Sequence, residues 1–507
     1  MFKIKIKLIY CALIISVINV ILYNIPLFKF VYNNINLSTF NGILLITSFV
    51  IIAIMLNLFV FYIGLYLLRL VGKWIIVLFF NINALCIYFI NNYGVIIDRS
   101  MIGNILNTNY AETSSFLSFS LILYLFFIGV IPSVLIYNIK YEKIKFKPFI
   151  IHNSLILLFI LLISYINSPN WLWIDKNSKK VGSLIMPWSY VVNTCRFYHK
   201  KNKENKKQKL LPNAKILNNT KSVCVVVIGE SARSANFSLY GYNKKTNPLL
   251  SKIKNLHIYK AESSATYTTA GVKAILDYEE SNDLNEILPN YLYRNGVDVI
   301  WRTTNWGEPT VNIKNYQDKN ELAKLCNDSK CSYDEILLHN LQDVILKSKK
   351  DKILIVLHTS TSHGPVYYKK YPPEFENFKP VCESVELSKC TNQELINAYD
   401  NTILYTDYIL ANLVKKLKGL NDYNTSMIYV SDHGESLGEN NLYMHGIPLS
   451  IAPKEQFEIP FIVWTSNDSI QLKNNKMLSQ YHVFHSVLDF LDVESVIYDE
   501  NMSIFKK

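Results

Sequence analysis

The sequence has few charged residues for its length. Only 18% of its 507 residues are charged, whereas a soluble protein usually carries about 25%. Half of the residues are hydrophobic, and the mean hydropathy is positive. This composition excludes a disordered chain and a small disulfide-stabilised protein, and it argues against a simple cytosolic enzyme. A chain of this length is too long for one ordinary domain, so we expect one membrane part and one water-soluble part.

The positive charge is not concentrated in one region. The formal net charge is +12, but lysines are spread along the whole chain. Nucleic acid is therefore not expected as a partner, and an anionic membrane surface is the better candidate.

Long hydrophobic runs are confined to the first third of the chain, and none has a lysine or arginine in its middle. The first run follows three lysines, as in a signal peptide, but no small-residue cleavage site comes after it. The sequence predicts an α-helical membrane domain of five spans over residues 1–166. The spans contain no charged residues and show no repeat, so a transporter is not favoured. The predicted spans are Leu8–Tyr23, Ile43–Leu68, Ile75–Ile90, Leu117–Ile139 and Phe149–Ile166.

Loop charges orient this domain. The N-terminus and the second and fourth loops carry nine lysines and arginines, whereas the other two loops carry only Lys29 and Arg99. Positively charged loops stay in the cytoplasm. We therefore predict a multi-pass protein of a bacterial inner membrane, with a cytoplasmic N-terminus and a periplasmic soluble domain.

The third loop has a helical pattern of its own, over about residues 96–115. Asn104, Thr108 and Glu112 are spaced four residues apart, so a helix would place them on one face. That face is either a solvated surface or a functional one.

Residues 167–221 are interpreted as an interfacial segment followed by a basic linker. Trp171, Trp173 and Trp188 suit the membrane interface. Residues 199–209 contain six lysines, which is typical of an exposed linker and could also attract acidic headgroups.

Residues 222–507 have the pattern of an α/β domain. Short β-branched runs alternate with helix-like stretches such as 392–418, which favours a mainly parallel sheet covered on both faces. In such sheets the site lies beyond the carboxyl ends of the strands. The predicted strands cover 223–231, 297–305, 353–360, 427–434 and 461–466, and polar residues at the first four ends are Glu230, Asn305, His358 with nearby His363, and Asp432 with His433.

Four cysteines fall in polar, loop-like segments of the soluble domain. Cys326 is close to Cys331, and Cys382 is close to Cys390. We interpret both pairs as disulfides of an oxidising compartment. Zinc binding by the four is the alternative, but the sequence lacks CxxC spacing and no histidine is adjacent.

Two carboxylates and an imidazole predict a metal site. Glu230, Asp432 and His433 supply oxygen and nitrogen ligands that suit zinc, and three such ligands leave a position for a reacting oxygen. His445 follows twelve residues after His433. The alternative is a set of turn carboxylates and solvated histidines.

A hydroxyl is the expected occupant of that position. Hydroxyl residues in 263–276 precede a helix-like stretch, and a helix N-terminus stabilises phosphates and alkoxides. Zinc would lower the pKa of such a hydroxyl, which could then accept a phosphoryl group covalently. The alternative is ordinary N-capping by Ser or Thr.

The chain resembles the membrane phosphoethanolamine transferases that modify lipid A, including the mobile colistin-resistance enzymes. The similarity covers nearly the whole chain. It implies five spans followed by an α/β domain of the alkaline-phosphatase/sulfatase type. The motifs that carry it are GES (229–231), SHGP (362–365), VCESVELSKCTNQELINAYDN (381–401), SDHGESLGEN (431–440) and MHGIP (444–448).

The resemblance also implies roles for individual residues. Zinc would be held by Glu230, Asp432, His433 and the nucleophilic threonine, with one ion bound tightly and a second possible. The nucleophile is placed at Thr268, with Thr266 and Thr269 as alternatives. The remaining roles concern substrates: His363 and His445 would act on the transferred phosphate, Asn305 would contact substrate, and Asn104, Thr108 and Glu112 would meet the lipid headgroup.

Several positions depart from the family pattern. Cysteines usual near the nucleophile are absent around Ser264, Lys273 and Ala274 replace a proline and a cysteine, and Glu308–Pro309 occupies a region where some relatives have lysine. These changes leave the chemistry intact but leave the acceptor open between a lipid A phosphate, a core sugar and a protein.

The expected activity is transfer of phosphoethanolamine from phosphatidylethanolamine to a lipopolysaccharide acceptor through a covalent threonine intermediate. Added ammonium groups would weaken the binding of cationic peptides such as polymyxins. Alternatives are a glycerol-phosphate transferase, a phosphate or sulfate ester hydrolase and, from another class, a membrane sensor. A monomer is expected.

Overall fold

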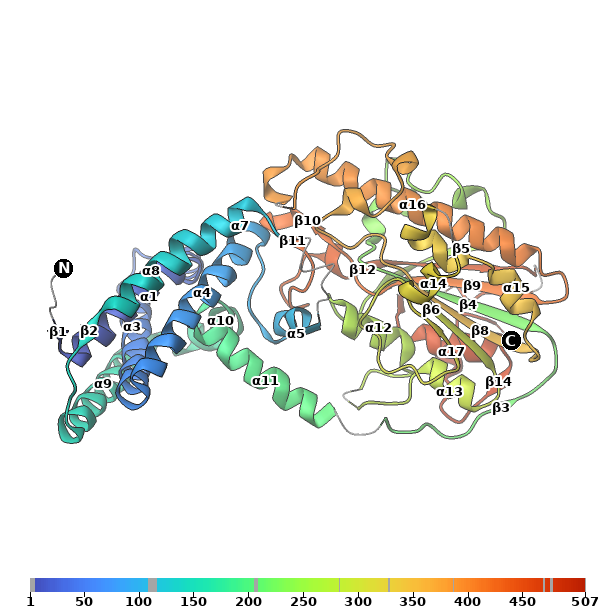
Figure 1. Ribbon diagram of the computed structural model, residues 1–507. Coiled ribbons are helices and arrows are strands. Elements are labelled where there is room, and N and C mark those ends of the chain that lie inside the picture. The colour runs from blue at the N-terminus through green and yellow to red at the C-terminus, as the bar shows by residue number, and fades with distance from the viewer. Residues whose placement is uncertain are drawn as a thin grey trace. The chain divides into compact units, whose positions relative to one another are not determined.

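The computed structural model describes residues 5–107, 116–204, 208–281, 283–326, 329–385, 387–467, 470–474 and 477–506 (Figure 1). The chain divides into two compact units, Met1–Lys200 and Lys201–Lys507. The first is helical and apolar and the second is α/β, which confirms the predicted fold class at this level.

Within the described part of the first unit, four helical segments are long and apolar enough to cross a membrane. They are α3 (Phe40–Leu68), α4 (Leu70–Tyr93), the continuous segment α7–η1–α8 (Phe119–Asn138) and α9 (Phe146–Ile166). A fifth span requires α1 (Leu8–Tyr23) and α2 (Ile25–Asn33) together, and this pair is bent by 60°. The predicted first span has the bounds of α1, which Asn24 separates from α2.

The helix expected over about 96–115 is described in part. Helix α5 covers Arg99–Asn107 and carries Asn104. Thr108 and Glu112 lie outside the described residues, so their common face stays a prediction.

Buried amides tie the segment after the last span to the bundle. The Asn83 side-chain amide donates to Asn19 Oδ1 at 2.8 Å, and the Tyr190 hydroxyl donates to Asn83 Oδ1 at 3.0 Å. Asn19 in turn donates to the Met186 carbonyl at 3.1 Å. Polar groups within a membrane need such internal partners. They fix the connection between α10 (Trp171–Leu184) and α11 (Trp188–Glu204) against α1 and α4.

The second unit is built on a mixed sheet. In the described residues the strand order is β13–β5–β12–β9–β4–β8–β6–β7. Strands β9, β4, β8, β6 and β7 are mutually parallel, as predicted, and β12 runs antiparallel to both neighbours. The bounds are β4 Ser222–Gly229, β5 Leu256–Glu262, β6 Asp298–Thr303, β7 Asn315–Gln317, β8 Lys352–His358, β9 Asn424–Ser431, β12 Glu458–Thr465 and β13 Leu478–Ser479.

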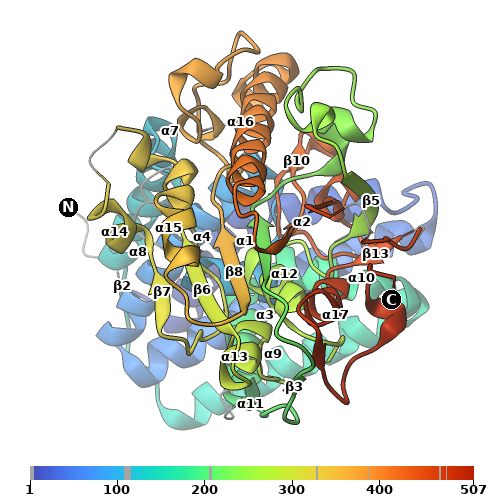
Figure 2. The same ribbon diagram turned by 90° about the vertical axis from the view of Figure 1, so that its right-hand side faces the viewer.

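Helices cover both faces of this sheet. Helices α12 (Thr268–Leu276), α13 (Leu288–Arg294) and α17 (His482–Phe490) pack on one face, and α15 (Leu341–Leu346) and α16 (Asn392–Lys418) lie on the other (Figures 1 and 2). On the face covered by α12, α13 and α17, every second residue of β4 packs into the hydrophobic core with these helices. These residues are Cys224, Val226 and Ile228. Each fully buried aliphatic side chain stabilises the fold by roughly 1.5–3 kcal/mol.

Helix α16 holds two loops through a buried polar turn. Tyr399 donates to the Ser231 carbonyl at 2.7 Å. Asp400 is fully buried, and Asn401 Oδ1 accepts two backbone N–H groups of the 377–378 segment. The Thr402 hydroxyl is 2.8 Å from that of Ser362. The partners of Asp400 are Asn236 at 2.6 Å, Lys244 at 2.7 Å and Tyr242 at 2.9 Å.

Two disulfides are present in the described part of this unit. They join Cys326 to Cys331 and Cys382 to Cys390, which are the pairs expected from the sequence.

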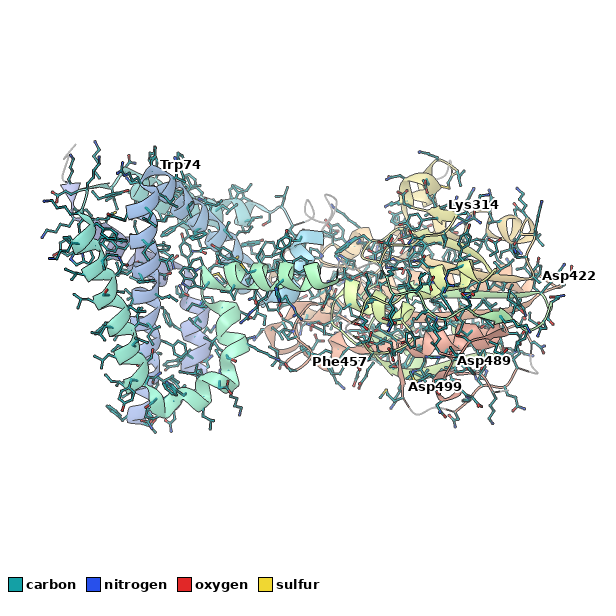
Figure 3. All side chains as sticks on the ribbon, turned by 90° about the horizontal axis from the view of Figure 1, so that it is seen from below. Trp74, Lys314, Asp422, Phe457, Asp489 and Asp499 are labelled. Carbon is teal, nitrogen blue, oxygen red and sulfur yellow. A yellow bond between two sulfur atoms is a disulfide. The ribbon has the colours of Figure 1, made fainter. Side chains whose placement is uncertain are left out.

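The two ends of the sheet differ in their loops. Asp422 precedes the amino end of β9, and Phe457 precedes antiparallel β12, so these residues mark opposite ends of the unit (Figure 3). The end near Phe457 includes two short paired strands, β10 (Ser436–Leu437) and β11 (Tyr443–Met444). The candidate site lies at this end.

Candidate active site

The predicted metal ligands meet at the carboxyl edge of the sheet. Glu230 directly follows β4, and Asp432 and His433 directly follow the adjacent strand β9. One ligand atom from each of the three lies within 4.8 Å of the others, and all three residues are buried. The parallel pairing of β4 and β9 thus brings together residues about 200 positions apart.

Asp432 presents one oxygen to the protein and one to this cluster. Its Oδ1 accepts the backbone N–H groups of Ser231 at 3.0 Å and His433 at 2.7 Å. Its Oδ2 is buried, has no hydrogen-bond partner among the residues the structure describes, and lies 3.4 Å from His433 Nε2. A buried carboxylate oxygen without a partner is costly, so its surroundings suit a cation.

Glu230 is held from two sides. The Ser231 hydroxyl donates to Oε1 at 2.6 Å, and the Asn305 amide donates to Oε2 at 2.6 Å. Asn305 also donates to the Thr359 carbonyl at 2.8 Å, so its amide group orients Glu230. The predicted substrate contact of Asn305 stays a prediction.

His433 has its ring fixed for ligation. Its Nδ1 is 2.8 Å from the Gly434 carbonyl, which can only accept, so Nδ1 carries the proton. Nε2 is then free to act as a ligand, 3.4 Å from Glu230 Oε1. A metal-binding histidine typically donates the N–H of its other ring nitrogen to such a carbonyl.

Thr268 is the first residue of α12 and faces the same cluster. Its Oγ1 is 3.3 Å from His433 Nε2 and 3.5 Å from Glu230 Oε2. The Thr266 hydroxyl instead donates to the Ile447 carbonyl at 2.6 Å. Close packing fixes α12 here, because a Cβ on Gly271 would lie only 2.1 Å from the Asp432 carbonyl oxygen. Of the candidate threonines, the geometry favours Thr268 over Thr266.

Two further histidines adjoin the cluster. The His445 ring lies 4.3 Å from the His433 ring and 5.4 Å from the His363 ring, measured between centroids. His363 Nδ1 is 2.7 Å from the Gly364 carbonyl, and His445 Nδ1 is 3.1 Å from Glu435 Oε1. Both predicted phosphate-directed histidines are therefore beside the candidate metal group.

Glu435 was missed by sequence reasoning. It accepts from the Tyr367 hydroxyl at 2.9 Å and contacts His445, and it is fully buried. In the sequence, only its place in the DHGE segment (432–435) could indicate a functional role, and a carboxylate there can equally be interpreted as a turn residue. It orients His445.

Burial and charge shift the pKa values of these groups. Burial, reinforced by Glu230, raises the pKa of Asp432 to about 7. Burial opposes protonation of His433, but Asp432 and Glu230 outweigh it and raise its pKa to about 10. Burial and the charge of His433 lower the pKa of His445 to about 3. A proton on His433 therefore offsets part of the negative charge of the two carboxylates, and a divalent cation bound by the same groups would take over that role.

Comparisons with known proteins agree with this arrangement. Residues 52–202 match the family described as "Phosphoethanolamine transferase EptA/EptB", and residues 222–493 match the family described as "Sulfatase". Phosphoethanolamine transferase EptA of Helicobacter pylori is 40% identical over 98% of this chain and 96% of its own. Phosphatidylethanolamine transferase Mcr-1 of Escherichia coli is 31% identical, with 84% of each chain covered.

Solved structures show the same fold. The integral membrane protein lipooligosaccharide phosphoethanolamine transferase A of Neisseria meningitidis matches with a TM-score of 0.89 and 26% identity over 99% of both chains. The C-terminal periplasmic domain of phosphoethanolamine transferase EptC from Campylobacter jejuni matches with a TM-score of 0.52 and 36% identity, over 59% of this chain and 97% of that domain. The chain therefore belongs to the phosphoethanolamine transferase family, with an apolar helical unit followed by an α/β unit of the sulfatase type.

Proposed function

We propose that the protein transfers phosphoethanolamine from phosphatidylethanolamine to lipid A or another lipopolysaccharide acceptor. Relatives are named for this group and for such acceptors, among them a Kdo(2)-lipid A phosphoethanolamine 7''-transferase of Salmonella typhimurium, 29% identical over 48% of this chain. The observation that carries the proposal is the position of Thr268 at the start of α12, with Oγ1 3.3 Å from His433 Nε2.

The residues present fit a zinc ion. Glu230, Asp432, His433 and Thr268 would hold it, and the unpartnered Asp432 Oδ2 is the feature that a cation satisfies. When bound, zinc would lower the pKa of a coordinated hydroxyl and supply positive charge near the phosphate. The family resemblance also implies room for a second zinc ion.

The residues of this chain then have distinct tasks in a two-step transfer. Thr268 Oγ1 passes its proton to the neutral imidazole of His363 or His445 and forms a bond to the donor phosphorus, while the bond from phosphorus to the diacylglycerol oxygen breaks. That leaving oxygen then takes up the same proton from the histidine that accepted it, His363 or His445. In the second step an acceptor oxygen gives up its proton and bonds to the same phosphorus, the bond from phosphorus to Thr268 Oγ1 breaks, and Oγ1 takes up that proton. The N-terminus of α12 stabilises negative charge throughout.

The proposal includes a location and an architecture. Residues 1–166 would form the membrane domain, 167–221 an interfacial segment and linker, and 222–507 the periplasmic catalytic domain, with the N-terminus in the cytoplasm. Asn104, Thr108 and Glu112 would meet the lipid headgroup. We expect the protein to act as a monomer.

Mass spectrometry of the peptide containing Thr268 tests the mechanism. Detergent-purified protein incubated with phosphatidylethanolamine should carry a phosphoethanolamine adduct on Thr268. The variants Thr268→Ala and His433→Ala should lose it, while Thr266→Ser, which keeps its bond to the Ile447 carbonyl, should retain it. An adduct on Thr269 would move the nucleophile by one residue.

The sulfatase match over residues 222–493 favours ester hydrolysis as a second candidate. Release of free phosphoethanolamine without transfer to lipopolysaccharide would support the hydrolase. Absence of both adduct and product in zinc-loaded wild-type protein would refute the proposed transferase.

A further inference from the structure

The loop after β6 packs directly on the nucleophile. Gly307 has φ of +100°, and a Cβ added there would lie 3.1 Å from Thr268 Cγ2. The backbone at Gly307 therefore lies next to the methyl group of Thr268, with little space for a side chain between them. Since Thr is β-branched, the position of its methyl group fixes the direction of its hydroxyl. The loop thus limits where Thr268 Oγ1 can point.

The same loop also holds a candidate metal ligand. Asn305 connects Glu230 Oε2 to the Thr359 carbonyl, at 2.6 and 2.8 Å. Two residues of one short segment, Asn305 and Gly307, therefore act on Glu230 and Thr268. A displacement of the segment would disturb both together.

Glu308 ties this segment to the sheet. Its Oε1 accepts from the Tyr316 hydroxyl at 2.7 Å, and its Oε2 lies 3.5 Å from His358 Nδ1. The side chain of Glu308 is 11% exposed and that of His358 is fully buried. Tyr316 belongs to β7 and His358 ends β8, so one carboxylate connects the loop to two strands.

The surroundings of Glu308 make this connection firm. The ring of Trp301 stacks on Tyr316 at 6.5 Å and meets His358 edge-on at 6.1 Å. Burial raises the pKa of Glu308, but His358 and Tyr316 lower it more, so the carboxylate is ionised. An ionised acceptor makes a stronger hydrogen bond with the Tyr316 hydroxyl than a neutral one would, and it attracts the His358 ring when that ring is protonated.

Other contacts hold the ends of the loop. At one end, the backbone N–H of Asn305 donates to the Thr303 hydroxyl at 2.9 Å. Asn290 of α13 donates to the Thr310 carbonyl at 2.9 Å and accepts the N–H of Asn312 at 2.6 Å. Glu308 lies between these ends and next to Gly307, where the loop meets Thr268.

We propose that Glu308 is a positioning residue for the transfer reaction, which through Tyr316 and His358 fixes the 305–308 backbone against Glu230 and Thr268. The assignment of a reaction step rests on the proposed function. The positioning itself is a property of the fold and can be measured without turnover.

Three variants of the full-length detergent-purified protein test this role. Glu308→Ala removes both contacts, Glu308→Gln keeps an acceptor for Tyr316, and Tyr316→Phe keeps the ring stack but removes one donor. The matched control is Glu279→Ala. Glu279 also accepts from a neighbouring tyrosine, at 2.7 Å, but this contact is exposed.

The first measurement is hydrogen exchange of peptides covering residues 303–312. Exchange in Glu308→Ala should be faster by about 10-fold, because loss of the anchor frees the segment locally. Tyr316→Phe and Glu308→Gln should give smaller increases, and Glu279→Ala none in these peptides. Wild-type exchange in folded Glu308→Ala would overturn the proposal. If that variant does not fold, Tyr316→Phe decides in the same way.

The second measurement separates positioning from substrate binding. With a fluorescent phosphatidylethanolamine analogue as donor, kcat of Glu308→Ala should fall by about 10- to 100-fold, since misplacement by about 1 Å costs about 100-fold. KM should change much less, and Glu308→Gln should recover part of kcat. An unchanged kcat, or a loss confined to KM, would overturn the proposal. If wild-type protein transfers no phosphoethanolamine, the proposed function fails, and the hydrogen-exchange rates alone then test the positioning role of Glu308.

Discussion

Replacing Gly271 by alanine should slow the transfer reaction strongly in a protein that still folds. A Cβ at this position would lie 2.1 Å from the Asp432 carbonyl oxygen and 2.7 Å from its carbon, whereas ordinary contact begins at 3.4 Å. The shortfall to the oxygen is 3.4 minus 2.1, or about 1.3 Å. Gln480 donates to this carbonyl at 2.7 Å and keeps it in place. Helix α12 must therefore move.

The movement acts on the proposed nucleophile, because Thr268 lies in the same turn of α12. A shift on the order of 1 Å would draw Oγ1 away from His433 Nε2 and lower kcat by about 100-fold. Overpacking costs about 1–3 kcal/mol, and the better helix propensity of alanine offsets about 1 kcal/mol of it. The net loss of stability should be no more than about 2 kcal/mol.

The assay compares adduct formation on the Thr268 peptide with the apparent unfolding temperature. The matched control is Gly182→Ala in α10, where an added Cβ meets no atom of the described residues within 4 Å. The control should form the adduct at the wild-type rate. A folded Gly271→Ala protein with wild-type adduct formation would refute the idea that contact between α12 and Asp432 positions Thr268.

Three other perturbations have defined outcomes. Thr268→Ser keeps the hydroxyl but loses the methyl contact with Gly307, so its rate of adduct formation should lie between those of wild type and Thr268→Ala; a rate equal to wild type would contradict this. In protein from which a chelator has removed metal ions, burial is the main cause of two raised pKa values. The pKa of Asp432 is about 7 and that of Glu435 is about 8. The folded protein then binds more protons than the unfolded chain, so its apparent unfolding temperature should rise as pH falls from about 8 to 6.5, and added zinc should flatten this dependence. Cys382→Ser opens the disulfide to Cys390 and should cost about 2–3 kcal/mol, measured as a lower unfolding temperature.

Elements with a strong local pattern were predicted closely. Helix α16 covers the expected Asn392–Lys418, because its apolar periodicity is preceded by Thr391, which forms a capping box with Glu394. Helix α12 begins at Thr268, the position expected for the nucleophile. The strands that end in Glu230 and Asp432 were also expected, since buried parallel strands read as continuous apolar runs.

Weaker or non-local features escaped sequence reasoning. Strand β5 was not predicted, because within 256–262 only Tyr259 and Ala261 are buried and polar residues alternate with them. Helix α2, which follows the bend at Asn24, was also not predicted, although Pro26 in its first turn is a local signal for a break between helices.

In the site, the motifs pointed to the candidate ligand residues, which the structure brings together, but not to the residues that support them. The contact of Gly271 with Asp432 joins residues 161 positions apart, and the tether from Glu308 to His358 joins residues 50 positions apart. Such pairs are set by the order of strands in the sheet, which local sequence does not encode.

The polar turn of α16 has a consequence for how the catalytic unit opens. Tyr399, Asp400, Asn401 and Thr402 hold the 231–244 loop and the 362–378 loop from a single helical turn. Neither loop can gain freedom at these anchors without affecting the shared turn. We therefore expect both loops to exchange their amide hydrogens as one cooperative foldon, with a common opening free energy, so that a substitution in one loop raises the proteolytic susceptibility of the other.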